Sequence, residues 1–301
     1  MSAQLDYLPA DDSFLEPDRV DAADPASARA VVIPFGLEAS VSYGGGTVAG
    51  PSAILAASQQ LELYDEELGR EAYLDYGVAA VREPAIARPI AAALEQLAGL
   101  VETVLAAGKF PLVLGGEHSL TAGAIRPFAK RHKDLVVLQF DAHADLRDGY
   151  QGEPFSHAAA MRRVLDHPGV SLVSVGIRAL SKPEAAFYDA NRDRITIHWA
   201  KDQARWNIED IVKPLKGRPV YVTFDIDAFD AAIMPATGTP TPGGLGYWQA
   251  LAILRRACTV SKVVGADLVE FAPIEGFHAY DYTAAALAYK MLSYALGGTK
   301  G

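Results

Sequence analysis

The sequence predicts an α/β fold in which a mostly parallel β-sheet is covered by helices on both faces. Seven short apolar segments alternate with helical stretches, and each segment is continuously apolar instead of alternating with polar residues. Strand–helix–strand units of this kind join parallel strands through right-handed crossovers. The chain has 301 residues, of which 50% are hydrophobic, so it can bury a large core.

The predicted strands are short runs rich in β-branched and other apolar residues, as expected for buried strands. In chain order they cover residues 28–35, 109–116, 133–141, 169–178, 193–199, 218–227 and 262–271. None of them alternates strictly between polar and apolar positions, which indicates that both faces of the sheet are buried.

Two segments between the strands have the periodicity of amphipathic helices. Residues 89–108 place apolar side chains on one helical face and end at a glycine, a common helix terminator. The members of this face are Leu94, Leu97, Val101, Val104 and Leu105. A second predicted stripe consists of Trp248, Leu251, Leu254 and Cys258.

The chain shows no internal repeat, low-complexity tract or linker that would divide it. We expect residues 1–27 to form an irregular N-terminal arm and residues 28–301 to form a single domain. The single cysteine, Cys258, excludes an internal disulfide framework and favours a reducing compartment. The acidic start lacks the features of a signal peptide, and no apolar run approaches the roughly 18 residues of a membrane span. These features predict a cytoplasmic protein without a membrane partner.

The formal net charge of −10 argues against nucleic acid as a partner and mildly favours a neutral or cationic small molecule. Acidic side chains are also concentrated where predicted strands end. "DAHAD" places Asp141, His143 and Asp145 there, with Asp148 three residues further on. Carboxylates this close repel one another unless a cation lies among them.

Two other predicted strands end in similar residues. "GGEHS" presents Glu117 and His118, and "FDIDAFD" presents Asp225 and Asp227. Ligand sites of parallel sheets lie beyond the carboxyl ends of the strands, where these side chains are expected to meet. Taken alone, Asp-x-Asp after a strand is most often a turn or a helix cap, and a histidine there can be satisfied by backbone.

Together the three segments offer two histidines and four aspartates without a thiolate. Such a mixed nitrogen and oxygen set suits hard or borderline divalent ions, manganese ahead of iron, cobalt or zinc. Six ligands exceed the need of one closed tetrahedral site, so the set predicts two metal ions. The expected ligands are His118, Asp141, His143, Asp145, Asp225 and Asp227.

The motifs "GGEHS", "DAHAD", "FDIDAFD" and "TGTPTPGGL" resemble those of the ureohydrolase family, the arginases and agmatinases. The resemblance extends from about residue 43 to about residue 292. It implies a three-layer α/β/α, arginase-like fold, with residues 28–301 as the catalytic domain. It also implies two Mn²⁺ per subunit and a homotrimer or homohexamer.

The same resemblance implies roles for individual residues. His118, Asp141, Asp145 and Asp225 resemble the ligands of one ion, and Asp141, His143, Asp225 and Asp227 those of the other. His157, Asp145 and Glu270 resemble catalytic residues, with Glu270 holding the guanidinium group and His157 moving protons. In this sequence Ala158 replaces the glycine that follows the family's histidine, which leaves the reach of His157 open. Otherwise His157 would be a surface histidine and Glu270 a buried strand-end glutamate.

The substrate is expected to be a guanidino compound, most of all agmatine, which would yield urea and putrescine. Arginases resemble one another in a loop with asparagine and serine that binds the α-carboxylate and α-amine of arginine. The matching loop here, 146–156, has no asparagine and no serine before Ser156, which disfavours arginine. An acidic rim would suit the second cation of agmatine. A guanidino acid such as guanidinobutyrate is the alternative, because Arg147 could bind its carboxylate.

Two other classes stay open at this point. Deacetylases share the fold, but they resemble one another in binding a single zinc ion through a different set of ligands. The second histidine of the present set, His118, argues against that class. A metal-binding homologue with impaired catalysis is the other, because Ala158 could displace His157 from its path.

Overall fold

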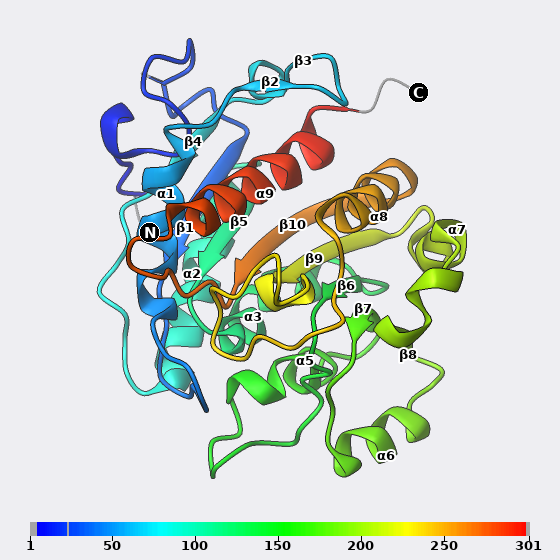
Figure 1. The fold of residues 1–301 in the computed structure, drawn as a ribbon. Coiled ribbons are helices and arrows are strands. Elements are labelled where there is room, and N and C mark those ends of the chain that lie inside the picture. The colour runs from blue at the N-terminus through cyan, green and yellow to red at the C-terminus, as the bar shows by residue number, and fades with distance from the viewer. Residues whose placement is uncertain (1–4, 23, 299–301) are drawn as a thin grey trace.

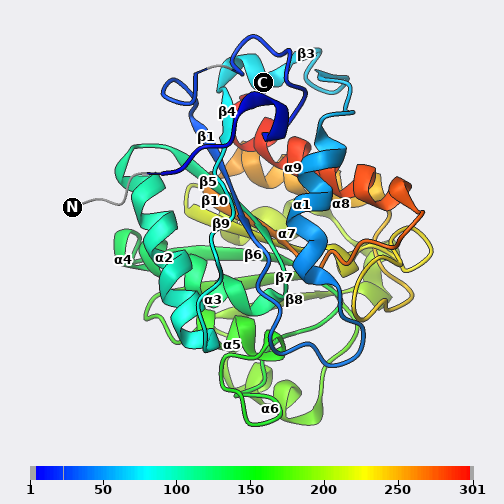
Figure 2. The ribbon, with the colours of Figure 1, turned by 90° about the vertical axis from the view of Figure 1, so that its left-hand side faces the viewer.

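The computed structural model describes residues 5–22 and 24–298 and has a central β-sheet between two layers of helices (Figures 1 and 2). All paired strands of the sheet run parallel. Its eight strands are β1 (Ala30–Phe35), β4 (Val78–Ala80), β5 (Phe110–Gly115), β6 (Val136–Phe140), β7 (Ser171–Ile177), β8 (Ile195–Trp199), β9 (Pro219–Asp225) and β10 (Lys262–Val269). The predicted fold class is confirmed.

The strand order across the sheet is β4-β1-β5-β10-β9-β6-β7-β8. Each of the seven predicted strands is present. The prediction missed β4, which has three residues, and a separate antiparallel hairpin of β2 (Tyr64–Asp65) and β3 (Arg70–Glu71). Segments of two or three residues are too short for a periodic pattern to show.

Helices cover both faces of the sheet. One layer contains α1 (Gly50–Ser58), α7 (Ile208–Val212), α8 (Tyr247–Val260) and α9 (His278–Leu296). The other contains α2 (Ile90–Ala106), α3 (Thr121–Ala124), α4 (Arg126–Arg131), α5 (Ala160–Val164) and α6 (Lys182–Ala190). Short 3-10 helices are η1 (Ala10–Asp12), η2 (Thr47–Ala49), η3 (Ala72–Asp75), η4 (His118–Leu120), η5 (His157–Ala159), η6 (Ala200–Arg205), η7 (Lys213–Leu215) and η8 (Ile226–Ala228).

Each face of the sheet has its own core, because successive side chains of a strand point to opposite sides. In β1, Val32 packs into the core under α1 and α9, whereas Val31 and Ile33 pack into the core under α2. The continuous apolar runs of the sequence therefore reflect burial on both sides.

The two predicted helical stripes are largely correct. In α2 the buried side includes Leu94, Leu97 and Val101, as predicted. In α8, Leu251 and Leu254 are buried, but Trp248 is 58% exposed, so its place in the stripe was wrong. The Trp248 ring instead lies beside Tyr247 and the Lys290 ammonium group, at the surface.

The N-terminal segment lies against the edge of the sheet. Tyr7 forms an antiparallel bridge with Val81, and the backbone N–H of Leu8 donates to the carbonyl of Ala80. Phe14 and Leu15 are completely buried. In the part of the chain that the structure describes, no helix has the length and apolar character needed to cross a membrane.

Candidate metal centre and active site

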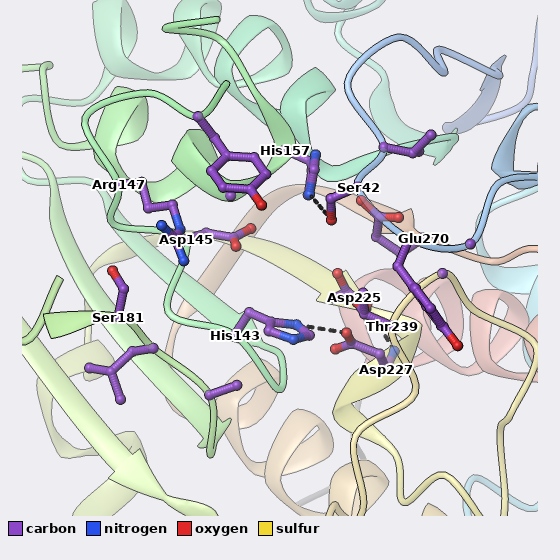
Figure 3. Close-up of a pocket in the computed structure, with 18 of the residues that line it drawn as sticks. Ser42, His143, Asp145, Arg147, His157, Ser181, Asp225, Asp227, Thr239 and Glu270 are labelled. Atoms are coloured by element: carbon purple, nitrogen blue, oxygen red, sulfur yellow. Dashed lines mark hydrogen bonds and ion pairs between the residues drawn. The ribbon is translucent and has the colours of Figure 1, made fainter. Parts of the chain in front are cut away.

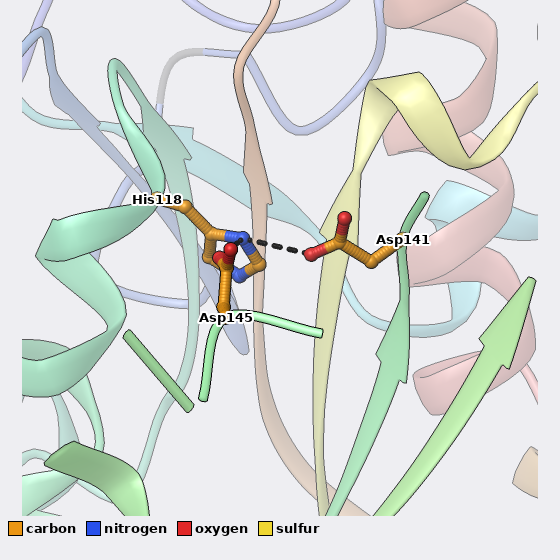
Figure 4. Close-up of side chains that lie close together, drawn as sticks. All are labelled: His118, Asp141 and Asp145. Carbon is orange, nitrogen blue, oxygen red and sulfur yellow. Dashed lines mark ion pairs between the residues drawn. The ribbon is translucent and has the colours of Figure 1, made fainter. Parts of the chain in front are cut away.

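The predicted metal ligands lie at the carboxyl ends of the parallel strands β5, β9 and β6 (Figures 3 and 4). His118 follows β5, and Asp141, His143 and Asp145 follow β6. Asp225 is the last residue of β9, and Asp227 follows it in η8. Glu270 follows β10, which lies between β5 and β9 in the sheet. Parallel strands bring their ends to one edge, so segments more than 100 residues apart in the sequence meet there.

His118 is the centre of the first cluster (Figure 4). Its Nδ1 lies 3.1 Å from Asp141 Oδ2, 3.0 Å from Asp145 Oδ2 and 3.4 Å from Asp225 Oδ2. This nitrogen is buried and has no hydrogen-bond partner. The other ring nitrogen, Nε2, lies 2.9 Å from the hydroxyl of Thr223. The ring is therefore fixed at one nitrogen, and the other faces three carboxylates.

His143 belongs to a second cluster that shares Asp141 with the first. Its Nδ1 lies 2.9 Å from Asp227 Oδ2 and 3.7 Å from Asp141 Oδ1. The ligand atoms of Asp141, His143 and Asp227 lie within 4.8 Å of one another, as do those of His118, Asp141 and Asp145. Asp141 thus stands between two groups that each have the composition of a metal site.

The backbone holds these side chains in place. The backbone N–H of His143 donates to Asp141 Oδ1 at 2.6 Å. The backbone N–H of Ala142 donates to Asp227 Oδ1 at 2.9 Å. Asp145 and Glu270 have φ angles of 51° and 62°, the left-handed region that non-glycine residues rarely occupy. Strained residues of this kind gather at functional sites, where the surrounding structure enforces them.

Electrostatics within the cluster are unbalanced in the protein alone. Burial and a neighbouring carboxylate raise the pKa of Asp145 to about 7. Burial also raises the pKa of Glu270 to about 8 and that of Asp225 well above its ordinary value. Burial alone would lower the pKa of His143, but the Asp227 carboxylate helps to raise it to about 12. A cation placed beside Asp145, Asp225 and Glu270 would favour their ionised forms and lower these pKa values again.

The residues fit divalent cations on two grounds. The unpartnered, buried Nδ1 of His118 can donate its lone pair to a metal, and three carboxylates already face it. The donor set combines imidazole nitrogen with carboxylate oxygen and contains no thiolate, which suits metals such as manganese.

A pocket of about 290 Å³ opens above the clusters. Asp145 lines it, together with five other predicted site residues: His143, His157, Asp225, Asp227 and Glu270. His118 and Asp141 lie deeper, almost completely buried. Ser42, Tyr43, Arg147, Tyr150 and Thr239 complete much of the wall. No sequence pattern singles out Ser42 or Tyr150, because their place at the pocket depends on loop geometry.

His157 lies at the pocket wall in spite of the following alanine. The centroids of its ring and the Tyr150 ring lie 6.2 Å apart in an edge-to-face arrangement. Its Nδ1 lies near the Ser40 hydroxyl, and its Nε2 lies near the Ser42 hydroxyl. Burial lowers the pKa of His157. Ala158 also lines the pocket, and its N–H donates to the Ser156 hydroxyl.

The mouth of the pocket differs from the acidic rim that was expected. Of the acidic side chains that line the pocket, Glu184 alone lies outside the floor. Its carboxylate already accepts from the N–H of Leu146 and from the N–H and hydroxyl of Ser181. Arg147 lies 3.7 Å from it and stacks over the Tyr150 ring. The rim is therefore balanced in charge.

Asp148, the carboxylate beyond "DAHAD", does not join the cluster. It is exposed and pairs with Arg163 at 2.6 Å on the outer surface.

A parallel α/β fold with a shared histidine–aspartate cluster at its strand ends is that of a metal-dependent hydrolase. The model of the "Arginase family" matches residues 28–296, and the chain belongs to this family. It is a ureohydrolase, an enzyme class that hydrolyses guanidino compounds.

Individual relatives agree with this assignment. The chain is 37% identical to an N(1)-aminopropylagmatine ureohydrolase of Synechocystis sp., over 93% of each chain. It is 36% identical to an agmatinase of Bacillus subtilis, over 82% of this chain and 84% of that protein. A crystal structure of the agmatine ureohydrolase of Thermoplasma volcanium is similar, with a TM-score of 0.83 and 30% identity, over 92% of this chain and 94% of that chain.

Proposed function

We propose that this ureohydrolase cleaves a linear guanidino amine to urea and an amine, and that agmatine, which yields putrescine, is its substrate. The observation that carries the proposal is the buried His118 Nδ1, which faces three carboxylates beneath a pocket that also contains Glu270. The names of the relatives support the class of substrate, because they include agmatinases and N(1)-aminopropylagmatine ureohydrolases.

Two Mn²⁺ ions are the proposed cofactors. His118, Asp141, Asp145 and Asp225 would hold one, and Asp141, His143, Asp225 and Asp227 the other. Bound there, the pair would supply hydroxide at neutral pH by lowering the pKa of water. With four aspartates, two divalent ions, one hydroxide and neutral histidines, the site carries about one negative charge. A guanidinium cation complements it.

Glu270 is proposed to hold the guanidinium group of the substrate. One oxygen, Oε1, accepts from the backbone N–H of His118 at 2.6 Å, which fixes the carboxylate at the pocket floor. A carboxylate can pair with a guanidinium through two parallel hydrogen bonds, and that pairing sets the angle of the substrate. Asp145 lies on the opposite side of the floor from Glu270. It is proposed to be both a metal ligand and a catalytic carboxylate.

His157 is proposed to give the leaving amine its proton. Its ring reaches the pocket wall, and its lowered pKa keeps it neutral near pH 7, so that it can take up a proton and release it.

The rest of the pocket suits the stem and second cation of agmatine. Tyr43 and Leu180 line the mouth and are 86% and 36% exposed. A terminal ammonium group placed there stays hydrated, so it needs no buried carboxylate partner. The α-carboxylate of arginine is bonded to the carbon that carries this amino group, so it would reach the same region. Loop 146–156 offers it no asparagine there, and the one cation of that loop, Arg147, already contacts Glu184.

A guanidino acid is the second candidate, and Arg147 is the observation that favours it. This guanidinium group lines the pocket and is held only by a 3.7 Å contact with Glu184 and by stacking on Tyr150. The carboxylate of a short guanidino acid would compete with Glu184 for the Arg147 guanidinium group.

The test is urea release from a panel of compounds by the metal-loaded protein. It compares agmatine, N(1)-aminopropylagmatine, arginine, 4-guanidinobutyrate and 3-guanidinopropionate. A penalty of about 3 to 5 kcal/mol for the arginine carboxylate corresponds to a roughly 10²- to 10⁴-fold preference for agmatine in kcat/KM. Equal rates for arginine and agmatine would contradict the proposal. A guanidino acid that is preferred, and loses that preference in Arg147→Gln, would establish the second candidate.

A cytoplasmic location and a homotrimer or homohexamer stay predictions for this chain. Cell fractionation checks the location. Light scattering on the protein as it elutes from a size-exclusion column checks the number of subunits.

A further inference from the structure

Glu117 is a buried carboxylate beside the proposed ligand His118, yet it faces away from the metal cluster. Its side chain is completely buried and points toward the segment that follows β1. Its Oε2 accepts from the N–H groups of Ala39 at 2.7 Å and Ser40 at 2.6 Å. Its Oε1 accepts from the hydroxyls of Ser40 at 2.9 Å and Ser119 at 2.6 Å. Four donors face its two oxygens, and both oxygens act as acceptors.

The Ser40 hydroxyl connects this carboxylate to His157. A hydroxyl has one hydrogen to donate and two lone pairs to accept with. Ser40 gives its hydrogen to Glu117 and accepts from the backbone N–H of His157 at 2.9 Å. Its remaining lone pair faces the Nδ1 of His157 at 3.1 Å. That contact is a hydrogen bond only when Nδ1 carries a hydrogen.

The other ring nitrogen of His157 is then the one that can exchange a proton. In the neutral ring one nitrogen donates and the other accepts, so hydrogen on Nδ1 leaves a lone pair on Nε2. The Nε2 atom lies 3.3 Å from the hydroxyl of Ser42, which lines the pocket (Figure 3).

We infer that Glu117 and Ser40 are positioning residues that hold His157 in the tautomer with hydrogen on Nδ1, so that Nε2 takes up and releases the proton. This inference rests on the proposed function in so far as His157 serves catalysis. The tautomer is inferred from the hydrogen bonds of Ser40 and does not depend on the substrate. Nucleophiles and bases in other enzymes are oriented in the same way by a third group.

Nitrogen-15 NMR reads the tautomer directly. The full chain, labelled with ¹⁵N in its histidines and loaded with diamagnetic Zn²⁺ in place of Mn²⁺, is sedimented and measured at about pH 8.5, where an ordinary histidine is neutral. The His157 signals are those missing in His157→Asn. Hydrogen on Nδ1 is expected in the parent, and a shift toward hydrogen on Nε2 in Ser40→Ala. Ser40→Thr, which keeps a hydroxyl, is expected to retain the parent tautomer.

Hydrogen on Nε2 in the parent, or an unchanged tautomer in Ser40→Ala, would overturn the inference. If Ser40→Ala does not fold, the parent spectrum still decides.

Kinetics supply the second measurement. Ser40→Ala is expected to lower kcat roughly 10-fold or more with little change in KM or metal content, and His157→Asn by roughly 10²- to 10⁴-fold. Ser52→Ala is the matched control, because this exposed serine bonds only to the carbonyl of Ala49. A parent-like kcat in Ser40→Ala would count against positioning. A fully active His157→Asn together with the expected spectra would instead show that the proposed role of His157 is wrong while the tautomer is right.

Discussion

At the scale of single residues, Glu270 shows how backbone strain and hydrogen bonding fix one side chain. Its φ of 62° turns the chain at the end of β10, and the turn aims the carboxylate at the pocket floor. The His118 N–H holds one oxygen. The same carboxylate is thus tied to the peptide of a proposed metal ligand, which couples the place of the guanidinium to the place of the metals.

Glu270→Gln keeps the size of the side chain and an oxygen for the His118 N–H, but it removes the charge. We expect a higher KM, a lower kcat and a fall of at least about tenfold in kcat/KM, because a guanidinium then lacks its anionic partner. Metal content should stay at the parent value in elemental analysis. The matched control is Glu95→Gln, since the Glu95 side chain is 78% exposed and pairs with Arg126 on the surface. A Glu270→Gln protein within about twofold of the parent would refute this role.

At the scale of elements, the turn after β5 depends on close packing. A Cβ atom at Gly116 would lie 2.1 Å from the carbonyl oxygen of Leu37, whereas one at Gly99, on the exposed side of α2, meets nothing within 4 Å. Gly116→Ala should lower the free energy of unfolding by about 1 to 3 kcal/mol and reduce turnover, because the turn that must shift to make room for the methyl group carries His118. Gly99→Ala should raise it by about 0.5 to 1 kcal/mol. Urea unfolding compares the two, and equal stability would contradict the packing argument.

Strand β8 carries a histidine that makes stability depend on pH. The Nε2 of His198 is buried without a hydrogen-bond partner, and burial lowers its pKa, although Asp210 opposes the shift. Below the ordinary pKa of about 6.5, the unfolded chain therefore binds more protons than the folded one, and stability falls as pH falls.

His198→Leu should flatten this dependence between about pH 7.5 and pH 5.5. One proton contributes at most about 1.4 kcal/mol per pH unit, and a partly exposed ring contributes less. Urea unfolding of parent and variant at both pH values measures the difference. Parallel losses of stability would show that His198 is not responsible.

The elements also show what sequence alone can predict. The strands with continuous apolar runs were found, because burial on both faces leaves a strong pattern. The six metal-ligand candidates could be selected because each follows a recognisable strand. Ser40 could not, since it contacts His157 across 117 residues of sequence and only the fold joins them. Trp248 was misplaced because an apolar stripe does not reveal which of its members lies at the surface.

At the scale of the whole molecule, bound metal should stabilise the fold. Chelation is expected to abolish turnover and lower Tm, and added Mn²⁺ should restore both, because a ligand at about 100 times its Kd stabilises by about 2.7 kcal/mol. Asp141→Asn is the comparison, since Asp141 stands between both clusters. The Tm of the Asp141→Asn variant should change less on chelation than the Tm of the parent protein. Full activity with one zinc per chain would contradict the two-manganese site.

The place of β10 in the sheet has a consequence for biosynthesis. This strand is the last of the sheet to leave the ribosome, yet it lies between β5 and β9 and joins β4-β1-β5 to β9-β6-β7-β8. Until residues 262–269 have emerged, each half presents an open edge, and His118 is separated from the aspartates of the other half. The histidine–aspartate cluster therefore forms only after residue 269 has emerged, and until then a nascent chain of this protein needs its exposed edges kept apart from those of its neighbours.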